Sequence, residues 1–182
     1  MLGLFAAFGL AAATGLNAYL PLLIVGLLAR YTDLIALKAP WSALTHPVVL
    51  VLLAVFLAIE FTVDKIPAVD TLNDIVQTLF RPAAGAILFA ASGNVISELS
   101  PVLAMVCGLL IAGSVHTVKA VARPAVTTGT LGAGNPVVSL AEDAVSGTTT
   151  VVAIVAPALL AVLALFILFW FLRRRRRRAT RC

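Results

Sequence analysis

The chain has 182 residues, of which 62% are hydrophobic and 12% charged, whereas soluble domains have about 45–50% apolar and about 25% charged residues. So few charged side chains cannot cover the outside of a soluble domain, and the composition therefore favours a membrane protein. Seven of the 13 basic residues lie between Arg173 and Arg181, and the remaining six are outnumbered by eight acidic residues. The net charge of +5 therefore reflects a basic tail, and no nucleic-acid partner is indicated.

The first apolar segment, residues 2–28, predicts a broken membrane-spanning helix. The first 29 residues carry no charged side chain, so the basic region that opens a signal peptide is missing and we expect the segment to be retained. The segment is long enough to cross about 30 Å of hydrocarbon. Gly15-Leu16-Asn17 and Pro21 interrupt it near the middle.

Two further helices are expected before residue 92. The apolar run from Pro47 to Val63 predicts a short span, with proline suited to the first helical turn. From Val69 to Phe80 the apolar residues follow helical spacing, and residues 83–91 extend this helix past a kink at Pro82. The opposite face of this helix carries a polar stripe of Asp70, Asn73, Asp74, Gln77 and Arg81.

The next helix is predicted to begin at Ser100-Pro101 and to continue through the apolar run 102–115. It ends in three basic residues that share one face, namely His116, Lys119 and Arg123. Residues 127–136 predict a flexible connection that closes at Asn135-Pro136, where a short amphipathic helix should begin.

The last predicted span, Val151–Leu172, has 22 uncharged residues and runs into six arginines. We therefore predict an all-α polytopic transmembrane bundle of about five spans, with one transmembrane domain (1–172) and a polybasic cytoplasmic tail (173–182). Basic residues are retained in the cytoplasm, so the C-terminus should be inside, and five crossings place the N-terminus outside. The protein should lie in the inner membrane, with anionic lipids as partners of Arg173–Arg178.

The first polar centre is a cluster of ionisable residues at membrane depth, where each charge costs about 2.5–3.5 kcal/mol and is by default functional. Its carboxylates are Glu60, Asp64, Asp70 and Asp74, and its ion-pair partners are Lys65, Arg81, His116, Lys119 and Arg123. One interpretation is a set of interhelical ion pairs, with Asp74 facing Lys119 across antiparallel helices. The other is a site for a hard cation such as Mg²⁺, Ca²⁺ or Na⁺; no other cofactor is expected.

The second polar centre surrounds the start of the short amphipathic helix, at Asn135, Ser139, Glu142 and Asp143. Helix N-termini attract anions, but Glu142 and Asp143 would repel one, so a bound cation fits this centre better. The alternative is a capped surface helix whose acidic residues offset the positive end of the helix dipole. Interruptions in two helices, at residues 15–17 and 134–135, favour a central site of the kind that transporters build.

Several motifs together resemble a bacterial membrane family known as a domain of unknown function. The motifs are Asp64-Lys65-Ile66-Pro67 with Asp70, Arg81-Pro82-Ala83-Ala84-Gly85, His116 with Lys119, and Gly134-Asn135-Pro136 with Ser139, Glu142 and Asp143. The resemblance covers nearly the whole chain and implies a small polytopic inner-membrane protein, without a substrate or mechanism. The chain departs from the family pattern at Asn17, where a basic residue is associated with the family.

Transport or conduction of a small ion or solute is the leading functional hypothesis, because charges of both signs gather at membrane depth. No catalytic residue is assigned. The alternatives are a metal-dependent intramembrane enzyme acting on a lipid or isoprenoid, and a non-catalytic membrane assembly protein. The sequence is also compatible with a homo-oligomer.

Overall fold

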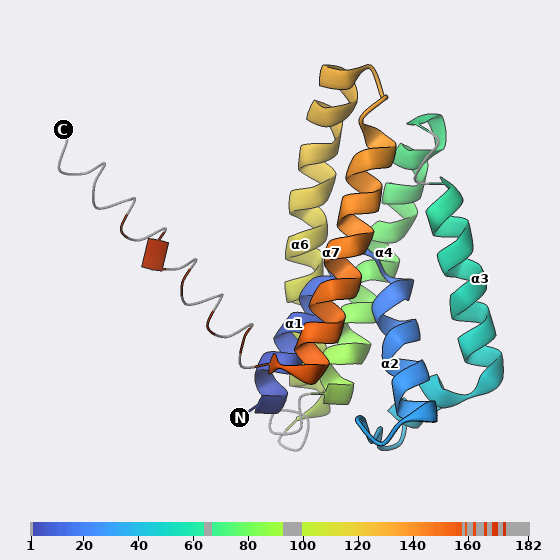
Figure 1. The fold of residues 1–182 in the computed structure, drawn as a ribbon, viewed down its shortest axis with the longest axis vertical. Coiled ribbons are helices and arrows are strands. Elements are labelled where there is room, and N and C mark those ends of the chain that lie inside the picture. The colour runs from blue at the N-terminus through green and yellow to red at the C-terminus, as the bar shows by residue number, and fades with distance from the viewer. Residues whose placement is uncertain are drawn as a thin grey trace.

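The computed structural model describes residues 2–63, 67–92 and 100–157 together with residues 159, 162, 166, 169, 170 and 173; the side chains of residues 2, 67–72 and 74 lie outside this description. The described residues form an all-α bundle without strands (Figure 1). The helices are α1 (Leu2–Leu16), α2 (Tyr19–Tyr31), the 3₁₀ helix η1 (Trp41–Thr45), α3 (Pro47–Val63), α4 (Pro67–Ser92), α6 (Pro101–Thr130) and α7 (Asn135–Val155). The all-α helical bundle expected from the sequence is thereby confirmed.

Three helices begin or continue where the sequence predicted. Helix α3 spans Pro47–Val63, and α4 passes through Pro82 without ending. Helix α6 begins with Pro101, and the hydroxyl of Ser100 accepts a hydrogen bond from the Leu103 N–H (3.3 Å). Proline lacks the backbone N–H, which in the first turn of a helix would have no partner within the helix in any case. The helix starts at Pro47 and Pro101 therefore reflect local backbone chemistry.

The first apolar segment forms a helical hairpin instead of one bent helix. Helix α1 rises from the end of the bundle that carries the N-terminus, breaks at Asn17-Ala18 about halfway along α4 and α6, and α2 returns to the same end (Figure 1). We call this end the lower half of the bundle and the part beyond the hairpin tip the upper half. The lower half contains α1, α2 and residues 84–92 and 101–115; the upper half contains residues 67–81, 116–130 and 135–143.

Contacts along the helices establish the direction of both arms of the hairpin. A Cβ on Gly3 would lie 3.3 Å from the carbonyl oxygen of Ser92, so the start of α1 lies beside the end of α4. A Cβ on Gly147 would lie 3.3 Å from the Leu20 side chain, so the start of α2 meets the middle of α7. Because α1 is antiparallel to α7 while α2 is parallel to it, the chain turns back at Asn17.

The connection expected at residues 127–136 is wrong in extent, since α6 continues through Pro124 to Thr130. The hydroxyls of Thr127, Thr128 and Thr130 donate hydrogen bonds to carbonyls of the preceding turn. Leu131, with φ 52°, and Gly132, with φ 84°, then end the helix.

The amphipathic helix expected to be short is 21 residues long, because α7 continues from Asn135 through Gly147 to Val155. It ends at Ala156, where the following Pro157 disfavours the helical conformation of the preceding residue. The predicted span Val151–Leu172 is therefore interrupted after its first five residues. Most of its remainder lies outside the described residues.

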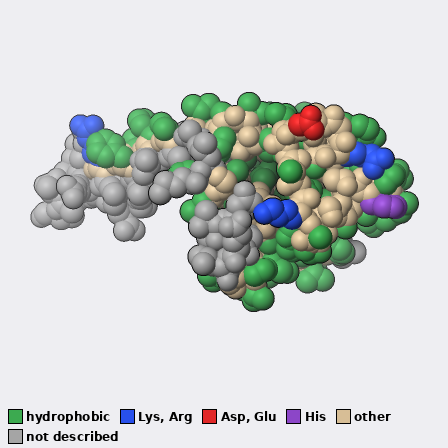
Figure 2. Space-filling model, turned by 90° about the horizontal axis from the view of Figure 1, so that it is seen from below, with side chains coloured by type: hydrophobic (Ala, Val, Ile, Leu, Met, Phe, Trp, Pro, Cys, Tyr) green, Lys and Arg blue, Asp and Glu red, His purple; other side chains and the backbone are tan. Residues whose placement is uncertain are grey.

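The bundle has apolar outer faces and encloses both apolar and polar side chains. Helices α4, α6 and α7 are long and apolar enough to cross a membrane, and α1, α2 and α3 are shorter apolar helices. Exposed hydrophobic side chains cover the outer faces, and Figure 2, which looks onto the lower end, shows them around its rim. The buried side chains include arginine, lysine, glutamate and aspartate, so the chain has the apolar helices of a membrane protein together with buried charged side chains.

Small residues allow the helices of the lower half to approach closely. A Cβ on Gly85 would lie 2.8 Å from the Gly108 carbonyl oxygen and 2.9 Å from the Thr14 hydroxyl, so α1, α4 and α6 meet at this glycine. A Cβ on Gly15 would lie 2.6 Å from the carbonyl oxygen of Ala112. Glycine is therefore required at both positions, and this packing holds the hairpin tip beside the polar half.

Candidate functional site

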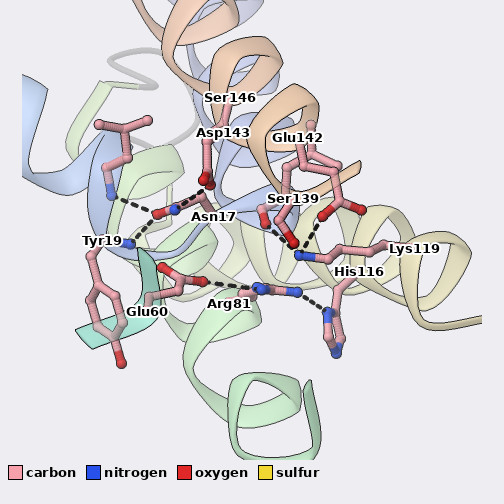
Figure 3. A network of polar contacts seen from close by, with 12 residues as sticks. Asn17, Tyr19, Glu60, Arg81, His116, Lys119, Ser139, Glu142, Asp143 and Ser146 are labelled. Atoms are coloured by element: carbon pink, nitrogen blue, oxygen red, sulfur yellow. Dashed lines mark hydrogen bonds and ion pairs between the residues drawn. The ribbon is translucent and has the colours of Figure 1, made fainter. Parts of the chain in front are cut away.

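A network of buried polar side chains lies around and beyond the hairpin tip (Figure 3). Its charged members are contributed by α3 (Glu60), α4 (Arg81), α6 (Lys119, Arg123) and α7 (Glu142, Asp143), with His116 between them. We call these residues, with Asn17 and Ser139, the polar network. It contains three cationic and three anionic side chains, so with a neutral His116 the named residues balance in charge.

Arg81 and Glu60 form the first part of the network. The two side chains are 0% and 2% exposed, and Arg81 Nη2 lies 3.0 Å from Glu60 Oε1. In so dry an environment removing either partner would leave a buried charge without its counterion. The pair therefore joins α3, a peripheral helix, to α4 in the centre.

The contacts of His116 fix its protonation state. Arg81 Nη1 lies 3.0 Å from His116 Nδ1, and the Thr78 hydroxyl lies 3.0 Å from Nε2. A guanidinium only donates hydrogen bonds, so Nδ1 must accept and carry no proton. The single ring proton is therefore on Nε2, directed at Thr78 Oγ1, and protonation of Nδ1 would break the contact with Arg81.

Lys119, Arg123 and Glu142 form the second part of the network. One carboxylate oxygen, Glu142 Oε2, lies 2.9 Å from Lys119 Nζ and 2.7 Å from Arg123 Nη2. The same guanidinium nitrogen donates to the Ser139 hydroxyl at 2.9 Å. Lys119 Nζ also donates to the carbonyl of Leu16 at 3.2 Å, at the open end of α1. The carboxylate shared by both cations is thus Glu142 of α7.

Asn17 connects the hairpin tip to this second part. Its side-chain oxygen accepts hydrogen bonds from the backbone N–H groups of Tyr19 (3.1 Å) and Leu20 (2.9 Å), which caps the start of α2. Its side-chain nitrogen donates to Asp143 Oδ1 at 2.8 Å. One amide therefore satisfies the end of a helix and a buried carboxylate at once, while the Ser146 hydroxyl donates to the Ala13 carbonyl at 2.9 Å nearby.

Most of the described site residues come together: Glu60 pairs with Arg81 within the first predicted centre, whereas Lys119 and Arg123 pair with Glu142 of the second. Asn135 lies at the upper end of α7, where its oxygen accepts from the Thr127 hydroxyl (3.1 Å). Asp64 and Lys65 and the side chains of Asp70 and Asp74 lie outside the description, so pairing of Asp74 with Lys119 stays a prediction. In the ranges 2–63, 67–92 and 100–157 no three His, Cys, Asp or Glu side chains cluster closely enough to hold a metal ion.

Asn17 is the site residue that the sequence analysis placed in a helix break and did not assign to the site. It is the only amide side chain in the first 29 residues, and this isolated polar residue in an apolar run was the available signal. Thr78 and Ser146 carried no comparable signal, because threonine and serine occur throughout the helices with hydroxyls bonded to their own backbone.

Comparison with protein families identifies the family of the chain. The model of the family "Domain of unknown function (DUF4126)" matches residues 4–177, which cover all but the first two residues of the hairpin and every residue of the polar network. The chain belongs to this family. No curated protein and no solved structure matches the chain. The family assigns no substrate, so function is argued from the polar network itself.

Proposed function

We propose that the protein moves a small ion or solute across the inner membrane and that the polar network is its binding centre. The observation that carries the proposal is the hairpin tip, where two half-helices meet ionisable side chains about halfway along the bundle (Figure 3). Interrupted helices beside charged side chains are how many transporters build central sites. Burial of five charged side chains, with Glu142 partly buried beside them, is costly, which favours a functional reason for keeping them.

The proposal includes a topology in which α3, α4, α6 and α7 cross the membrane and the apolar segment after Pro157 crosses a fifth time. The hairpin then enters and leaves from the side of the N-terminus. This topology puts the N-terminus outside and Arg173–Arg178 in the cytoplasm, as the retention of basic residues favours. Residues 173–182 then act as a cytoplasmic tail that contacts anionic lipid.

A flux screen in proteoliposomes tests the proposal. Purified protein is reconstituted, and gradients of Na⁺, Mg²⁺, Ca²⁺, protons, chloride and acetate are imposed in turn, so that the hard-cation interpretation is tested as well. We expect wild-type protein to dissipate at least one gradient faster than empty liposomes. The double variant K119M/E142Q, which removes one charge of each sign from the network, should lose this flux.

Asp33→Asn is the matched control, because Asp33 is an exposed carboxylate in the loop after α2, outside the polar network. It should keep wild-type flux. If correctly inserted wild-type protein dissipates none of the six gradients, the proposal is wrong.

A further inference from the structure

Glu142 lies where an anionic ligand would lie. Two cations from α6 converge on its single oxygen Oε2, at 2.9 Å from Lys119 Nζ and 2.7 Å from Arg123 Nη2. The Ser139 hydroxyl shares the same guanidinium nitrogen at 2.9 Å. Two charged donors with an adjacent hydroxyl form a receptor for a small anion, because charge-assisted hydrogen bonds to an oxyanion are the strong ones.

Lys119 and Arg123 are held in place, whereas Glu142, which occupies the site between them, is more accessible. The side chains of Lys119 and Arg123 are 2% and 5% exposed, and that of Glu142 is 15% exposed. Lys119 is also held by the Leu16 carbonyl at the hairpin tip. The ion-pair contacts of Glu142 with the described residues all use one of its two oxygens. Glu142 can therefore move out of the site while Lys119 and Arg123 keep their positions.

We propose that Lys119, Arg123 and Ser139 bind a small monovalent anion, a carboxylate or a halide, and that Glu142 occupies this site until the anion displaces it. This inference rests on the proposed transport function and names its solute. An incoming anion replaces the charge that Glu142 withdraws, so the two buried cations keep a counterion throughout. Acidic neighbours do not oppose the anion, because Glu142 is exchanged for it and Asp143 is bound by Asn17 (2.8 Å).

The geometry also limits the size of the anion. One carboxylate oxygen of Glu142 occupies the site between the two nitrogens of Lys119 and Arg123. Ser139, which is on the same helix as Glu142, contacts the Arg123 guanidinium. Chloride, formate and acetate match a single charged atom or a short carboxylate. Gluconate, a large carboxylate, does not, and therefore serves as the background anion that keeps ionic strength constant.

The test measures binding of acetate to purified protein in detergent, by calorimetry and by stabilisation against thermal unfolding. In wild-type protein Glu142 competes with acetate, and apparent affinity falls in proportion to the fraction of molecules with an open site. Glu142→Gln removes the competitor, so we expect it to bind acetate at least about tenfold more tightly than wild-type protein. K119M/E142Q should lose this gain, and Asp33→Asn should bind like wild-type protein.

Acetate affinity of Glu142→Gln equal to or below that of wild-type protein would overturn the inference. If Glu142→Gln does not fold, Glu142→Asp takes its place: it keeps the charge but withdraws it by one methylene, and it too should bind acetate more tightly. The inference and the transport proposal fail separately. Cation flux by wild-type protein with no gain in acetate binding contradicts the inference alone, whereas the gain in binding without any flux contradicts transport alone.

Discussion

The face that α6 turns inward differs between the lower and upper halves of the bundle. In the lower half it presents Ala104, Gly108 and Ala112, which let α4 and α1 approach until backbones nearly touch. In the upper half the same face presents His116, Lys119 and Arg123, which reach α4 and α7 through ion pairs and hydrogen bonds.

The difference follows from where the hairpin ends. Below its tip, α1 lies against α4, α6 and α7, so three helices must admit a fourth and only small side chains leave room. Above the tip there is no hairpin, and long polar side chains fill the interior instead. Van der Waals packing therefore stabilises the lower half and electrostatic interactions the upper half, which leaves the upper half able to exchange partners.

The largest expected effect is the loss of one partner from a buried ion pair in the upper half. Glu60→Gln and Arg81→Met should each lower the free energy of unfolding by about 3–5 kcal/mol, because each leaves a buried charge uncompensated. The double variant should recover most of the loss. Denaturant unfolding in detergent measures all three, and single losses that simply add in the double variant would show that the two residues are not coupled.

In the lower half, adding one methyl group should cost less. Gly108→Ala places a Cβ 2.6 Å from that of Phe89, so we expect a loss of about 1–3 kcal/mol in the free energy of unfolding. Gly113→Ala is the control on the same helix. Its nearest neighbour is 3.7 Å from the new Cβ, so it should be neutral or stabilise by up to about 1 kcal/mol from helix propensity. Equal effects at both glycines would contradict close packing at Gly108.

At the boundary between the halves, Asn17→Ala removes a helix cap and a donor to Asp143, with an expected cost of about 1–2 kcal/mol. Asn17→Asp keeps the cap but places two carboxylates together. The exchange N17D/D143N restores one donor and one acceptor and should regain most of the stability that Asn17→Asp loses. Thermal unfolding of the three variants measures this, and an exchange no more stable than Asn17→Asp would argue against the contact.

The smallest effect on stability, below about 0.5 kcal/mol, is expected for single cysteines that report the path of the hairpin. In a background with Cys107 and Cys182 replaced by alanine, a cysteine before Met1 and one at Asp33 should react with an impermeant reagent from the same side. A cysteine at Ala133, in the turn between α6 and α7, should react from the other. Labelling of the first two cysteines from opposite sides would contradict the hairpin and show that the first apolar segment crosses the membrane once.

Features set by neighbouring residues could be read from the sequence. The start of α3 at Pro47, the start of α6 at Ser100, and the shared face of His116, Lys119 and Arg123 follow from capping chemistry and helical spacing, and all three predictions are confirmed. The predicted break near Asn17 is also confirmed, since α1 ends at Leu16 and α2 begins at Tyr19. Antiparallel packing of α4 and α6, expected from their short connection, is also found (Figure 1).

Features set by packing between distant segments could not be predicted. A break does not reveal whether the chain continues or turns back. Gly85, Gly147 and Asn17 settle this only through neighbours more than twenty residues away. Lys119 had several carboxylates available at similar sequence distances, so the sequence could not select Glu142. The helix α6 likewise continues past Pro124 although threonine has a weak helix propensity. The threonine hydroxyls there bond to carbonyls of the same helix.

The hairpin also determines the order in which the protein can be assembled during synthesis. Its residues leave the ribosome first, yet Asn17 bonds a residue 126 positions later and Ala13 bonds one 133 positions later. Until α7 has been translated, the polar tip lacks the Asp143 that accepts a hydrogen bond from its amide. Docking of the hairpin tip against α7 must therefore follow the synthesis of α7.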